Sequence, residues 1–495
     1  MRRELPWLLE RARRAGDRAA LEGGGERVTY AELALRARRA AQALRELGAE
    51  PGEPLGALLG NGLPFALALH ASLLCGTAFL PLNARLTARE LAPQLAESGA
   101  RLLLHGPGAL AEIAAELGRA LPGLRVAPAA ALARAEAKPL PDPAPPDPEA
   151  ILAILFTSGT EGRPKGALLP AGSFAASAAA SARHLGRAAG ARWLACLPLY
   201  HVGGLSILVR SLLAGTTVLL HERFDASAVS RALDAERATG ISLVPTMLAR
   251  LLEARGPQPA PAALRCLLLG GAPAPAALLE RARERGLPVA PTYGLTEACS
   301  QVATRRPGEA HGPEGAGLEP LPGIALRIAR EDGSEAAPGE AGEILVRGPG
   351  LMRGYLGRPE ESAAALRGGW LHSGDLGRLD ARGWLRVLDR RSDLVVSGGE
   401  NVYPAEVEAA LLEHPAVREA GVAGVPDPDY GSRPAAWLVV EGEPPAPDEL
   451  LAFCRARLAG YKLPVRFTFV PALPRGPGGK LLRRHLARAS REDPR

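Results

Sequence analysis

The chain has 495 residues, of which 47 % are hydrophobic, 23 % are charged and 4 % are aromatic, and its formal net charge is +6. A chain of this length predicts two or more domains, and the balance of apolar and charged residues is typical of a soluble globular protein. The small positive charge, without a basic stripe interleaved with aromatic residues, argues against nucleic-acid binding.

The cysteines and the most apolar stretch indicate where the protein works. The five cysteines are odd in number, widely spaced and not arranged as CxxC, which predicts a reducing, cytoplasmic setting without disulfides or structural zinc. The N-terminus lacks the continuous apolar core and the cleavage site of a secretory signal. The most apolar stretch, residues 54–82, is interrupted by Gly, Asn, His and Pro, so we expect buried helix and strand and no membrane span.

The first part of the chain alternates between short β-rich segments and amphipathic helices. Residues 27–48 predict a short strand, a cap at Thr29 and a helix that ends at Gly48. After the proline-rich connector KPLPDPAPPDPEA, the apolar run ILAILF (151–156) predicts a buried strand, and LRCLLLGG (264–271) predicts another in a second α/β block. This alternation favours α/β layering.

The last third of the chain has a different pattern. From about residue 320, short β segments separated by glycine turns predict a small β-rich subdomain. The segment after GGENVYP returns to alternating helices and strands, and its length of about a hundred residues suits a separate small domain. We therefore expect an α/β protein with a large N-terminal domain of layered α/β subdomains plus a β-rich subdomain, and a small α+β C-terminal domain.

The loop TSGTEGRPKG, which follows the first of these strands, has the composition of a phosphate-binding loop. Such a loop can turn several backbone N–H groups toward one anion, and Thr157, Ser158 and Thr160 add hydroxyl donors. Lys165 adds a charge, and it is one of only four lysines among 59 Lys and Arg residues. Because lysine is a compact point charge and arginine a planar fork, a retained lysine indicates a specific task. Pro164 stands where a Walker loop has its second glycine, so the loop is of another type.

Two later stretches carry candidate carboxylates. PTYGLTEACSQ places Glu297 beside Thr296, and Mg²⁺ prefers one or two carboxylates together with phosphate oxygens. Tyr293, in the same stretch, is a candidate to stack on a base. GWLHSGDLG places Asp375 between two glycines, where it suits hydrogen bonds to a ribose diol. Both stretches also have an ordinary structural explanation, because a Thr-Glu pair often starts a helix and an Asp often forms a turn.

These groups, with Arg390 in LDRRSDLVVSGGENVYP, describe a site for a nucleoside triphosphate. The chain has no GxSxG elbow and no well-placed Cys-His pair. A covalent intermediate on one of its own side chains is therefore not expected.

The chain contains five motifs that, in this order, resemble the signatures of the adenylate-forming superfamily: TSGTEGRPKG, YGLTE, GWLHSGDLG, DRRSDLVVSGGENVYPAEVE and PRGPGGKLLRR. This superfamily includes acyl-CoA synthetases, peptide-synthetase adenylation domains and firefly luciferase, and the resemblance spans about residues 27 to 487. It implies an N-terminal domain of residues 1–389 and a mobile C-terminal lid domain of residues 390–495. It also implies ATP, Mg²⁺ and CoA, and two steps: a carboxylate attacks ATP to give an acyl-adenylate and pyrophosphate, and a thiol then displaces AMP.

The resemblance also implies roles for individual residues. Lys480 would be the catalytic lysine that the C-terminal domain brings to the reacting oxygens, with Thr296 at the α-phosphate and Arg390 at the nucleotide as further catalytic residues. Glu297 would bind Mg²⁺, and Ser392 would be the hinge. The implied nucleotide-binding residues are Thr157, Ser158, Gly159, Thr160, Lys165, Gly271, Ala272, Pro273, Tyr293, Thr296, Asp375, Arg390 and Lys480.

A narrower resemblance, in PLYHVGGLS, LLLGGAPAP and TYGLTEACSQV, is to the o-succinylbenzoate–CoA ligases of menaquinone biosynthesis. His201 would take the place of the family's gating aromatic residue. Ser206 and Arg210 are four residues apart and share a face on a helix, so Arg210 is a candidate to bind the second carboxylate of o-succinylbenzoate, directly or through water. An arginine that snorkels at a helix edge explains the same residue equally well. The implied substrate-binding residues are His201, Ser206, Arg210, Gly270, Gly294 and Ser300, and the implied CoA-binding residues are Gly398, Gly399 and Lys462.

Three positions depart from the family pattern. Glu161 places a negative charge in the phosphate loop where a second threonine is usual, and we expect it to point outward or to contact metal-bound water. Ser392 replaces the usual Asp or Lys of the hinge, and Gly203 replaces a serine of the substrate motif. These departures leave the hinge energetics and the acyl substrate open.

The sequence therefore predicts an ATP- and Mg²⁺-dependent carboxylate–CoA ligase that acts on o-succinylbenzoate. The nearest alternative is a medium-chain or aryl acyl-CoA ligase, and from a different class a module that loads a carrier-protein phosphopantetheine. A luciferase-like oxygenase or an inactive homologue fits less well, because the shared motifs do not indicate oxygen chemistry and the expected catalytic residues are all present. A homo-oligomer is compatible with the sequence.

Overall fold

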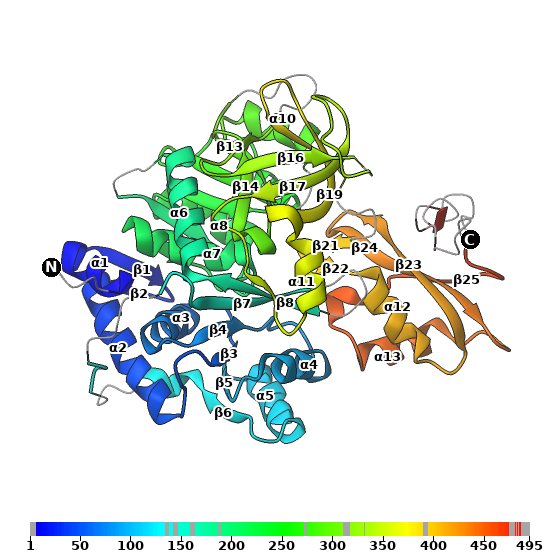
Figure 1. Cartoon of the computed structure of the whole chain (residues 1–495), viewed down its shortest axis with the longest axis horizontal. Helices are drawn as coiled ribbons and strands as arrows, with labels where there is room; N and C mark the ends of the chain where they lie inside the picture. Colours follow the sequence, from blue (N-terminus) through cyan, green and yellow to red (C-terminus); the bar gives the residue numbers. More distant parts are fainter. Residues whose placement is uncertain are drawn as a thin grey trace.

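The structure is a computed structural model in which the chain forms a large body and a small body (Figure 1). In Figure 1 the large body runs from the blue N-terminus to the yellow segments, and the orange small body lies to its right. The described residues are 6–133, 138–141, 147–158, 164–186, 190–271, 274, 276–309, 317–330, 332–389, 395–474, 481, 483 and 485–486. No helix within these ranges is long and apolar enough to cross a membrane.

The first sheet of the large body has seven strands. In order across the sheet they are β18 (Gly354–Tyr355), β8 (Pro164–Pro170), β7 (Ile151–Ser158), β4 (Ala78–Pro81), β3 (Pro54–Leu58), β5 (Leu102–His105) and β6 (Arg125–Pro128). The strands from β7 to β6 are parallel, whereas β7 and β8 form an antiparallel pair. The helices of this region are α2 (Tyr30–Glu46), α3 (Leu63–Cys75), α4 (Ala88–Ser98), α5 (Ala109–Ala120) and the 3₁₀ turn η1 (Ala129–Ala133).

Two of these helices begin with a capping box. The Thr29 side chain accepts a hydrogen bond from the Glu32 backbone, and the Glu32 carboxylate accepts one from the Thr29 backbone, which satisfies two N–H groups at the start of α2. Thr87 and Glu90 form the same box at the start of α4. The predicted Thr29 cap is confirmed.

The second sheet has nine strands. In order across the sheet they are β15 (Glu319–Pro320), β14 (Ser300–Thr304), β13 (Val289–Leu295), β12 (Cys266–Leu269), β11 (Gly240–Leu243), β9 (Arg192–Ala195), β10 (Thr217–Leu220), β1 (Ala19–Gly23) and β2 (Glu26–Thr29). Its helices are α1 (Trp7–Ala15), α6 (Ala171–Leu185), α7 (Val202–Ala214), α8 (Ala226–Ala235), α9 (Pro245–Arg255), α10 (Ala276–Glu284) and the 3₁₀ turn η2 (Thr296–Ala298).

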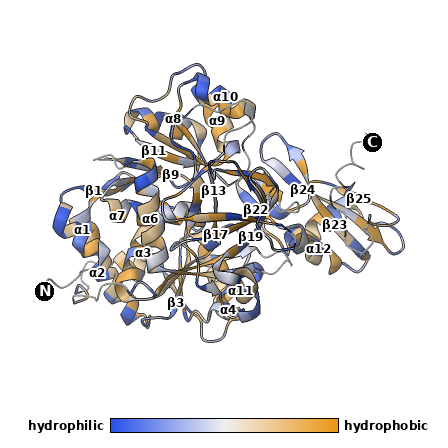
Figure 2. Ribbon diagram, turned by 45° about the horizontal axis from the view of Figure 1, so that its top comes forward, coloured by the Kyte–Doolittle hydropathy of each residue, from blue (hydrophilic) through white to orange (hydrophobic). Residues whose placement is uncertain are grey.

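A layer of helices lies between the first two sheets. The largest apolar cluster contains buried residues of α2, α3, α6 and α7 together with strands of both sheets, while α8, α9 and α10 pack on the other face of the second sheet. Hydrophobic colouring accordingly runs along the inner strands and α3, whereas the outer helix α1 shows hydrophilic residues (Figure 2). The predicted α/β layering is confirmed.

The third sheet is the predicted β-rich subdomain. Its antiparallel strands are β16 (Ala325–Ala329), β17 (Gly342–Arg347), β19 (Leu371–Leu379) and β20 (Leu385–Asp389), accompanied by α11 (Pro359–Ala365) and the 3₁₀ turn η3 (Arg367–Gly369).

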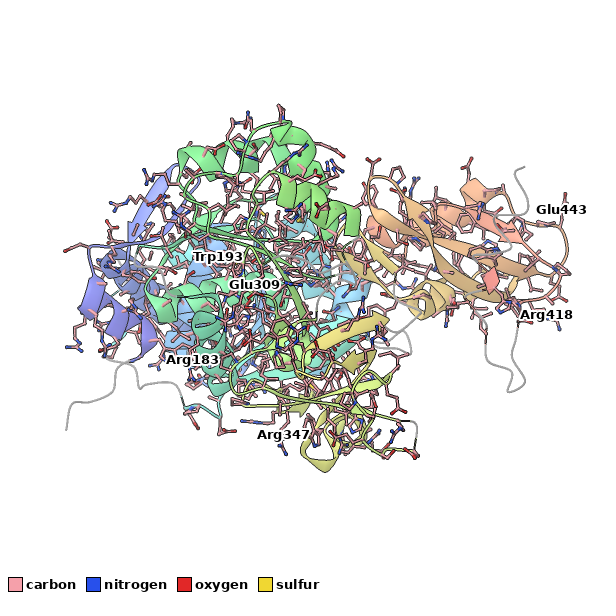
Figure 3. The ribbon with its side chains drawn as sticks, turned by 90° about the horizontal axis from the view of Figure 1, so that it is seen from above. Arg183, Trp193, Glu309, Arg347, Arg418 and Glu443 are labelled. Carbon is pink, nitrogen blue, oxygen red and sulfur yellow. The ribbon has the colours of Figure 1, made fainter. Side chains whose placement is uncertain are left out.

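The small body is an α+β unit around a fourth sheet. Its strands are β22 (Glu400–Val402), β21 (Val395–Ser397), β24 (Gly431–Val440), β23 (Val417–Asp427) and β25 (Phe467–Phe469), with α12 (Pro404–Leu412), α13 (Pro447–Arg455) and the 3₁₀ turn η4 (Gly460–Lys462). Arg418 and Glu443 mark the end of this body that lies away from the large body (Figure 3).

The boundaries differ from the sequence-based expectations in detail. The predicted strand 151–156 continues to Ser158 as β7, and β8 begins at Pro164, so both ends of the predicted loop 157–166 belong to strands. The third sheet ends at Asp389 and the fourth begins at Val395, while residues 390–394 lie outside the described residues. A domain boundary between residues 389 and 390 therefore stays a proposal.

Candidate active site

Two cavities adjoin where the large body meets the small body. The first has a volume of about 460 Å³ and is lined by the predicted phosphate, metal and ribose residues Thr157, Lys165, Thr296, Glu297 and Asp375. The second has a volume of about 540 Å³ and is lined by the predicted acyl and CoA residues His201, Gly270, Gly294, Ser300, Gly398 and Gly399. Both cavities have Tyr200, His201, Leu295, Thr296, Glu400 and Asn401 in their walls.

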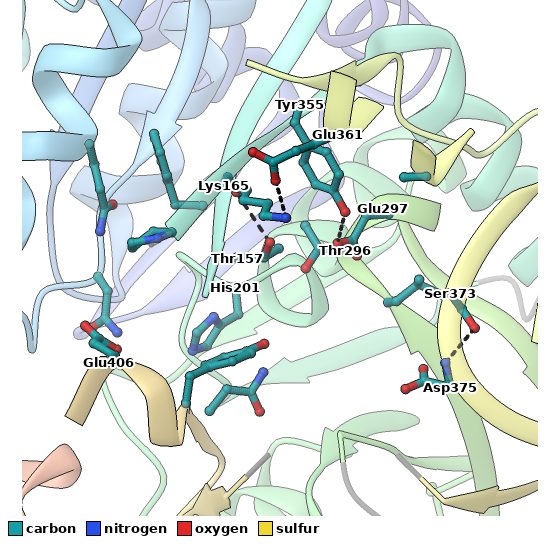
Figure 4. A pocket seen from close by; sticks show the side chains of 18 of the residues that line it. Thr157, Lys165, His201, Thr296, Glu297, Tyr355, Glu361, Ser373, Asp375 and Glu406 are labelled. Atoms are coloured by element: carbon teal, nitrogen blue, oxygen red, sulfur yellow. Dashed lines mark hydrogen bonds and ion pairs between the residues drawn. The ribbon is translucent and has the colours of Figure 1, made fainter. Parts of the chain in front are cut away.

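The predicted phosphate-binding residues of the first cavity lie on the pair β7–β8, whose register places Thr157 opposite Lys165. The Lys165 ammonium forms an ion pair with Glu361 of α11 and lies 5.5 Å from the centroid of the Tyr355 ring (Figure 4). Lys165 lowers the pKa of the Glu361 carboxyl. The side chain of Ser158 and the residues Gly159, Thr160 and Glu161 lie outside the described residues.

The predicted metal carboxylate lies in the same cavity. Glu297 follows Thr296 in the turn η2, and its Oε1 accepts a hydrogen bond from the Tyr355 hydroxyl at 2.9 Å (Figure 4). Mg²⁺ commonly uses one or two carboxylates and completes its shell with phosphate oxygens and water. A single held carboxylate beside Lys165, the predicted phosphate-binding lysine, therefore fits an ion that arrives with the triphosphate.

The predicted ribose carboxylate is held from two sides. Asp375 of β19 is 8 % exposed, and its Oδ2 accepts a hydrogen bond from the Tyr293 hydroxyl at 2.7 Å. The Asp375 backbone N–H donates to the Ser373 hydroxyl at 3.1 Å (Figure 4). Tyr293 is itself buried, and its stacking on a base stays a prediction. Gly271 lines the second cavity, whereas Ala272 and Pro273 lie outside the described residues.

The second cavity is shaped by close backbone contacts. A Cβ on Gly294 would lie 1.8 Å from the Ser300 carbonyl oxygen, so no side chain fits at this point of the β13–β14 pair without moving the wall. Ser206 is 3 % exposed, and its hydroxyl donates to the Gly203 carbonyl at 3.2 Å. Ser206 is thus turned into its own helix, and it is not among the described residues that line the cavity.

Arg210 lies behind the wall of the second cavity. Its guanidinium donates to Gln301 Oε1 at 2.7 Å and lies 5.2 Å from the centroid of the Trp193 ring, and Gln301 lines the cavity. Gln301 Oε1 also accepts from the Ser181 hydroxyl at 2.7 Å. Burial lowers the pKa of Arg210 to about 10, so the guanidinium remains charged at neutral pH. Within the described residues, Arg210 therefore reaches the wall of the second cavity through its hydrogen bond to Gln301.

Glu400 is the main site residue that the sequence did not assign. It belongs to β22 of the small body, is 2 % exposed, and accepts hydrogen bonds from large-body donors: the Tyr200 hydroxyl at 2.8 Å, the His201 ring at 2.9 Å and Arg85 at 3.2 Å. Burial alone would raise the pKa of its carboxyl, but His201, Arg85 and Tyr200 outweigh burial and lower the pKa to about 2. The available signal was the sequence GGEN, in which a carboxylate directly follows two glycines.

Those glycines form the turn between β21 and β22. Gly398 and Gly399 have φ angles of +58° and +87°, a conformation that glycine adopts without steric cost. Lys462 of η4 is enclosed, with its ammonium 2.8 Å from Glu90 Oε1 and 2.6 Å from Glu406 Oε1. Burial would lower the pKa of Lys462, but the two carboxylates raise it. The predicted residues Arg390, Ser392 and Lys480 lie outside the described residues.

None of the five cysteines is a candidate nucleophile. All are buried, and burial raises the pKa of each thiol, to about 12 for Cys196 and Cys266 and to about 11 for Cys454. Since the thiolate is the reactive form, these side chains are inert at neutral pH.

Comparisons with known proteins agree with this geometry. Residues 8–356 match the family model described as AMP-binding enzyme, and residues 406–480 match the model described as AMP-binding enzyme C-terminal domain. The chain belongs to the AMP-binding enzyme family. It is 42 % identical over 483 residues to a 2-succinylbenzoate–CoA ligase from Bacillus licheniformis, covering 97 % of this chain and 98 % of that protein.

The chain is also similar to solved structures of o-succinylbenzoate CoA synthetase from Bacillus subtilis at 40 % identity. A double mutant of that enzyme bound to its product analogue OSB-NCoA matches with a TM-score of 0.93 over 99 % of both chains. The same enzyme matches with a TM-score of 0.76 in complex with the acyl-adenylate OSB-AMP, over 99 % of both chains. With ATP and magnesium ion the TM-score is 0.75, over 98 % of this chain and 99 % of that one.

Proposed function

We propose that the chain is an ATP-dependent ligase that joins 2-succinylbenzoate to CoA through an acyl-adenylate, releasing AMP and pyrophosphate. The observation that carries this function is a nucleotide cavity and an acyl cavity that meet at Thr296 and His201, in a chain similar over its full length to 2-succinylbenzoate–CoA ligases.

In the first step a carboxylate oxygen of the acid attacks the α-phosphorus of MgATP, and the bond to the β-phosphate oxygen breaks. We assign Lys165 to the departing phosphates, Glu297 to the Mg²⁺ that the triphosphate carries, and Asp375 to the ribose. Tyr293 orients Asp375 through its hydroxyl, and Tyr355 orients Glu297 in the same way. Lys480, with Thr296, would stabilise the charge that builds at the α-phosphate.

In the second step the CoA sulfur attacks the acyl carbonyl carbon, the bond to AMP breaks, and the thiol proton is released. Gly398 and Gly399 line the second cavity from the small body, so we assign this turn to the pantetheine route. Glu400 fixes the His201 ring at the point where the two cavities meet. The TM-score of 0.93 to the complex with OSB-NCoA, against 0.75–0.76 to the ATP and adenylate complexes, supports an arrangement suited to this second step.

The second carboxylate of 2-succinylbenzoate requires a counter-charge within the acyl cavity. Arg210 is the candidate, and its guanidinium reaches the cavity wall through the Gln301 amide. We assign Gln301 and Ser300 to the direct contact and Arg210 to the charge behind it.

Unpaired cysteines also favour a cytoplasmic enzyme.

The test is steady-state turnover with ATP, Mg²⁺ and CoA across 2-succinylbenzoate, benzoate and fatty acids of increasing length. We expect kcat/KM for 2-succinylbenzoate to exceed the others by at least ~100-fold, or about 2.7 kcal/mol of discrimination. A preference for fatty acids would contradict the substrate assignment. Absence of pyrophosphate release with every carboxylate would contradict the ligase itself.

A further inference from the structure

Among the described residues, the most deeply buried cluster of charges that crosses between the two bodies surrounds Lys462. The side chains of Lys462, Glu90 and Glu406 are only 6 %, 8 % and 14 % exposed. Lys462 and Glu406 both belong to the small body, in η4 and α12, whereas Glu90 belongs to α4 of the large body. The Lys462–Glu90 contact therefore exists only while the two bodies are docked in this way.

Glu90 is held in place before the small body arrives. Its Oε2 accepts hydrogen bonds from the Thr87 backbone N–H at 2.9 Å and from the Thr87 hydroxyl at 2.9 Å, as part of the capping box of α4. Its Oε1 is the atom that binds Lys462. The helix cap thus fixes one carboxylate oxygen and presents the other to the junction.

The residue types suit this arrangement. The compact Lys462 ammonium binds two carboxylates at 2.6 and 2.8 Å. The guanidinium of an arginine is a planar fork and would need its two carboxylates in a different arrangement. This accounts for a retained lysine at position 462 of a chain that otherwise uses arginine. It also accounts for Lys462 differently from the CoA contact that the family resemblance implied.

Lys462 and Glu406 line the first cavity, and the cluster is connected through Tyr461 to Arg85 and Glu400, which line the acyl cavity. Tyr461, next to Lys462, accepts a hydrogen bond from Asn83 at 3.2 Å, and Arg85 lies 4.7 Å from the centroid of its ring. Asn83 and Arg85 also contact Glu400, which follows the turn of Gly398 and Gly399. A shift of η4 therefore alters how this turn sits against the cavity.

We propose that Glu90 is a positioning residue for thiol transfer: it captures Lys462 when the small body docks and so holds the Gly398–Glu400 turn at the acyl cavity. The inference rests on the proposed two-step function. When the small body turns away for the first step, Lys462 keeps Glu406 and loses Glu90. Glu90 therefore acts on the second step and leaves the first unaffected.

The test uses Glu90→Gln, which removes the charge and retains an oxygen that can accept from Thr87. Adenylate formation is measured as 2-succinylbenzoate-dependent exchange of pyrophosphate into ATP, and thiolysis as single-turnover reaction of supplied acyl-adenylate with CoA. We expect thiolysis to slow at least ~10-fold, equivalent to about 1.4 kcal/mol, with exchange changed less than ~2-fold. Equal loss in both steps, or no loss in either, would overturn the proposal.

We call the Lys462–Glu90 contact the clamp. Two comparisons separate its specific effect on thiolysis from a general structural effect of the substitution. Glu413→Gln weakens an exposed pair with Arg89 that crosses the same junction, and also a pair with Arg457 inside the small body. We expect less than ~2-fold loss, because exposed pairs contribute little. Lys462→Met should slow thiolysis, and adding Glu90→Gln to it should cause no further loss, because both changes remove one interaction. A Glu413 effect as large as that of Glu90, or multiplying losses in the double variant, would contradict the clamp.

A measurement that does not depend on turnover tests the clamp separately from the proposed ligase function. Small-angle X-ray scattering of the full chain saturated with 2-succinylbenzoyl-CoA should fit the docked arrangement for the wild type and depart from it for Glu90→Gln. Failure of the wild type to use 2-succinylbenzoate would reject the proposed function and leave this scattering test in force. Identical profiles for the two proteins would overturn the clamp.

Discussion

Inside the large body, Phe65 and Phe79 are fully buried and their rings meet edge to face with centroids 5.4 Å apart, whereas the junction with the small body buries the charges of Glu400 and Lys462. An apolar cluster also runs from α4 and its sheet into the small body.

This difference shows how one chain combines permanent and reversible contacts. Apolar packing depends on buried area and tolerates small changes of geometry. A buried ion pair must recover a large desolvation cost, so it is favourable only in a well-fitted geometry and is lost when one partner moves away. Glu400 accepts from Tyr200, His201, Arg85 and Asn83, and Lys462 binds two carboxylates. Such contacts therefore suit a junction that forms for one step and opens for another.

The largest expected effect on stability is in the core. Phe65→Ala should lower the free energy of unfolding by about 3–5 kcal/mol, because the lost ring leaves a cavity among residues that cannot collapse into it. Denaturant unfolding measures this loss. The folded fraction should run both half-reactions with an unchanged ratio, and a selective loss of thiolysis would contradict the separation of core from junction.

The largest expected effect on a single step is at the junction. Glu400→Ala leaves the Tyr200, His201 and Arg85 donors without their shared acceptor, and we expect thiolysis of supplied acyl-adenylate to slow about 100-fold, or about 2.7 kcal/mol. Adenylate formation should change by less than ~3-fold. The melting temperature of the Glu400→Ala protein, measured in parallel, should stay close to that of the wild type.

A smaller effect is expected behind the acyl cavity. Arg210→Gln removes the charge that supports Gln301, and we expect kcat/KM for 2-succinylbenzoate to fall about 10-fold, or about 1.4 kcal/mol, mainly through KM. The ratio of kcat/KM for 2-succinylbenzoate to that for benzoate is the deciding measurement, because it does not depend on the folded fraction. An unchanged ratio would show that Arg210 only packs against Trp193.

The smallest expected effect is the dependence of the docked arrangement on pH. Since the pKa of Glu400 is lowered from 4.5 to about 2 in the docked arrangement, its contribution is complete well above pH 4.5 and is lost as the pH falls toward 2. The docked arrangement should therefore weaken relative to the separated one as the pH falls from about 4.5 toward 2. Scattering profiles over this range measure the change, and Glu400→Gln should remove it.

The sequence predicted the parts of the site that local patterns determine. The strand before the phosphate loop, the Thr29 cap and the β-rich subdomain carrying Asp375 all follow from periodicity and turn residues in short windows. The clustering of Thr157, Lys165, Glu297 and Asp375 in one cavity was expected from ordered motifs that resemble a known superfamily.

The contacts across the junction could not be predicted in this way. Glu400 accepts hydrogen bonds from Tyr200 and Arg85, which are 200 and 315 positions away in the sequence. A local sequence pattern does not indicate which distant residues meet when the two bodies dock. The CoA contact that the family resemblance implies for Lys462 stays a prediction, and the sequence did not show that Glu90 lies opposite this lysine. The contact of Arg210 with the second carboxylate, direct or through water, stays a prediction. The sequence did not show that Arg210 donates to Gln301, since the position of Gln301 depends on the packing of α6 and α7 against β14.

The central claim is that the small body serves the two steps in two arrangements, and it is tested most directly by measuring both half-reactions on Lys480→Ala and Glu400→Ala. Lys480→Ala should slow adenylate formation by ~10²–10³-fold, the usual effect of removing one preorganised donor, and leave thiolysis nearly intact. Glu400→Ala should show the opposite bias. If each variant lost both half-reactions to the same extent, the account of two arrangements would be wrong.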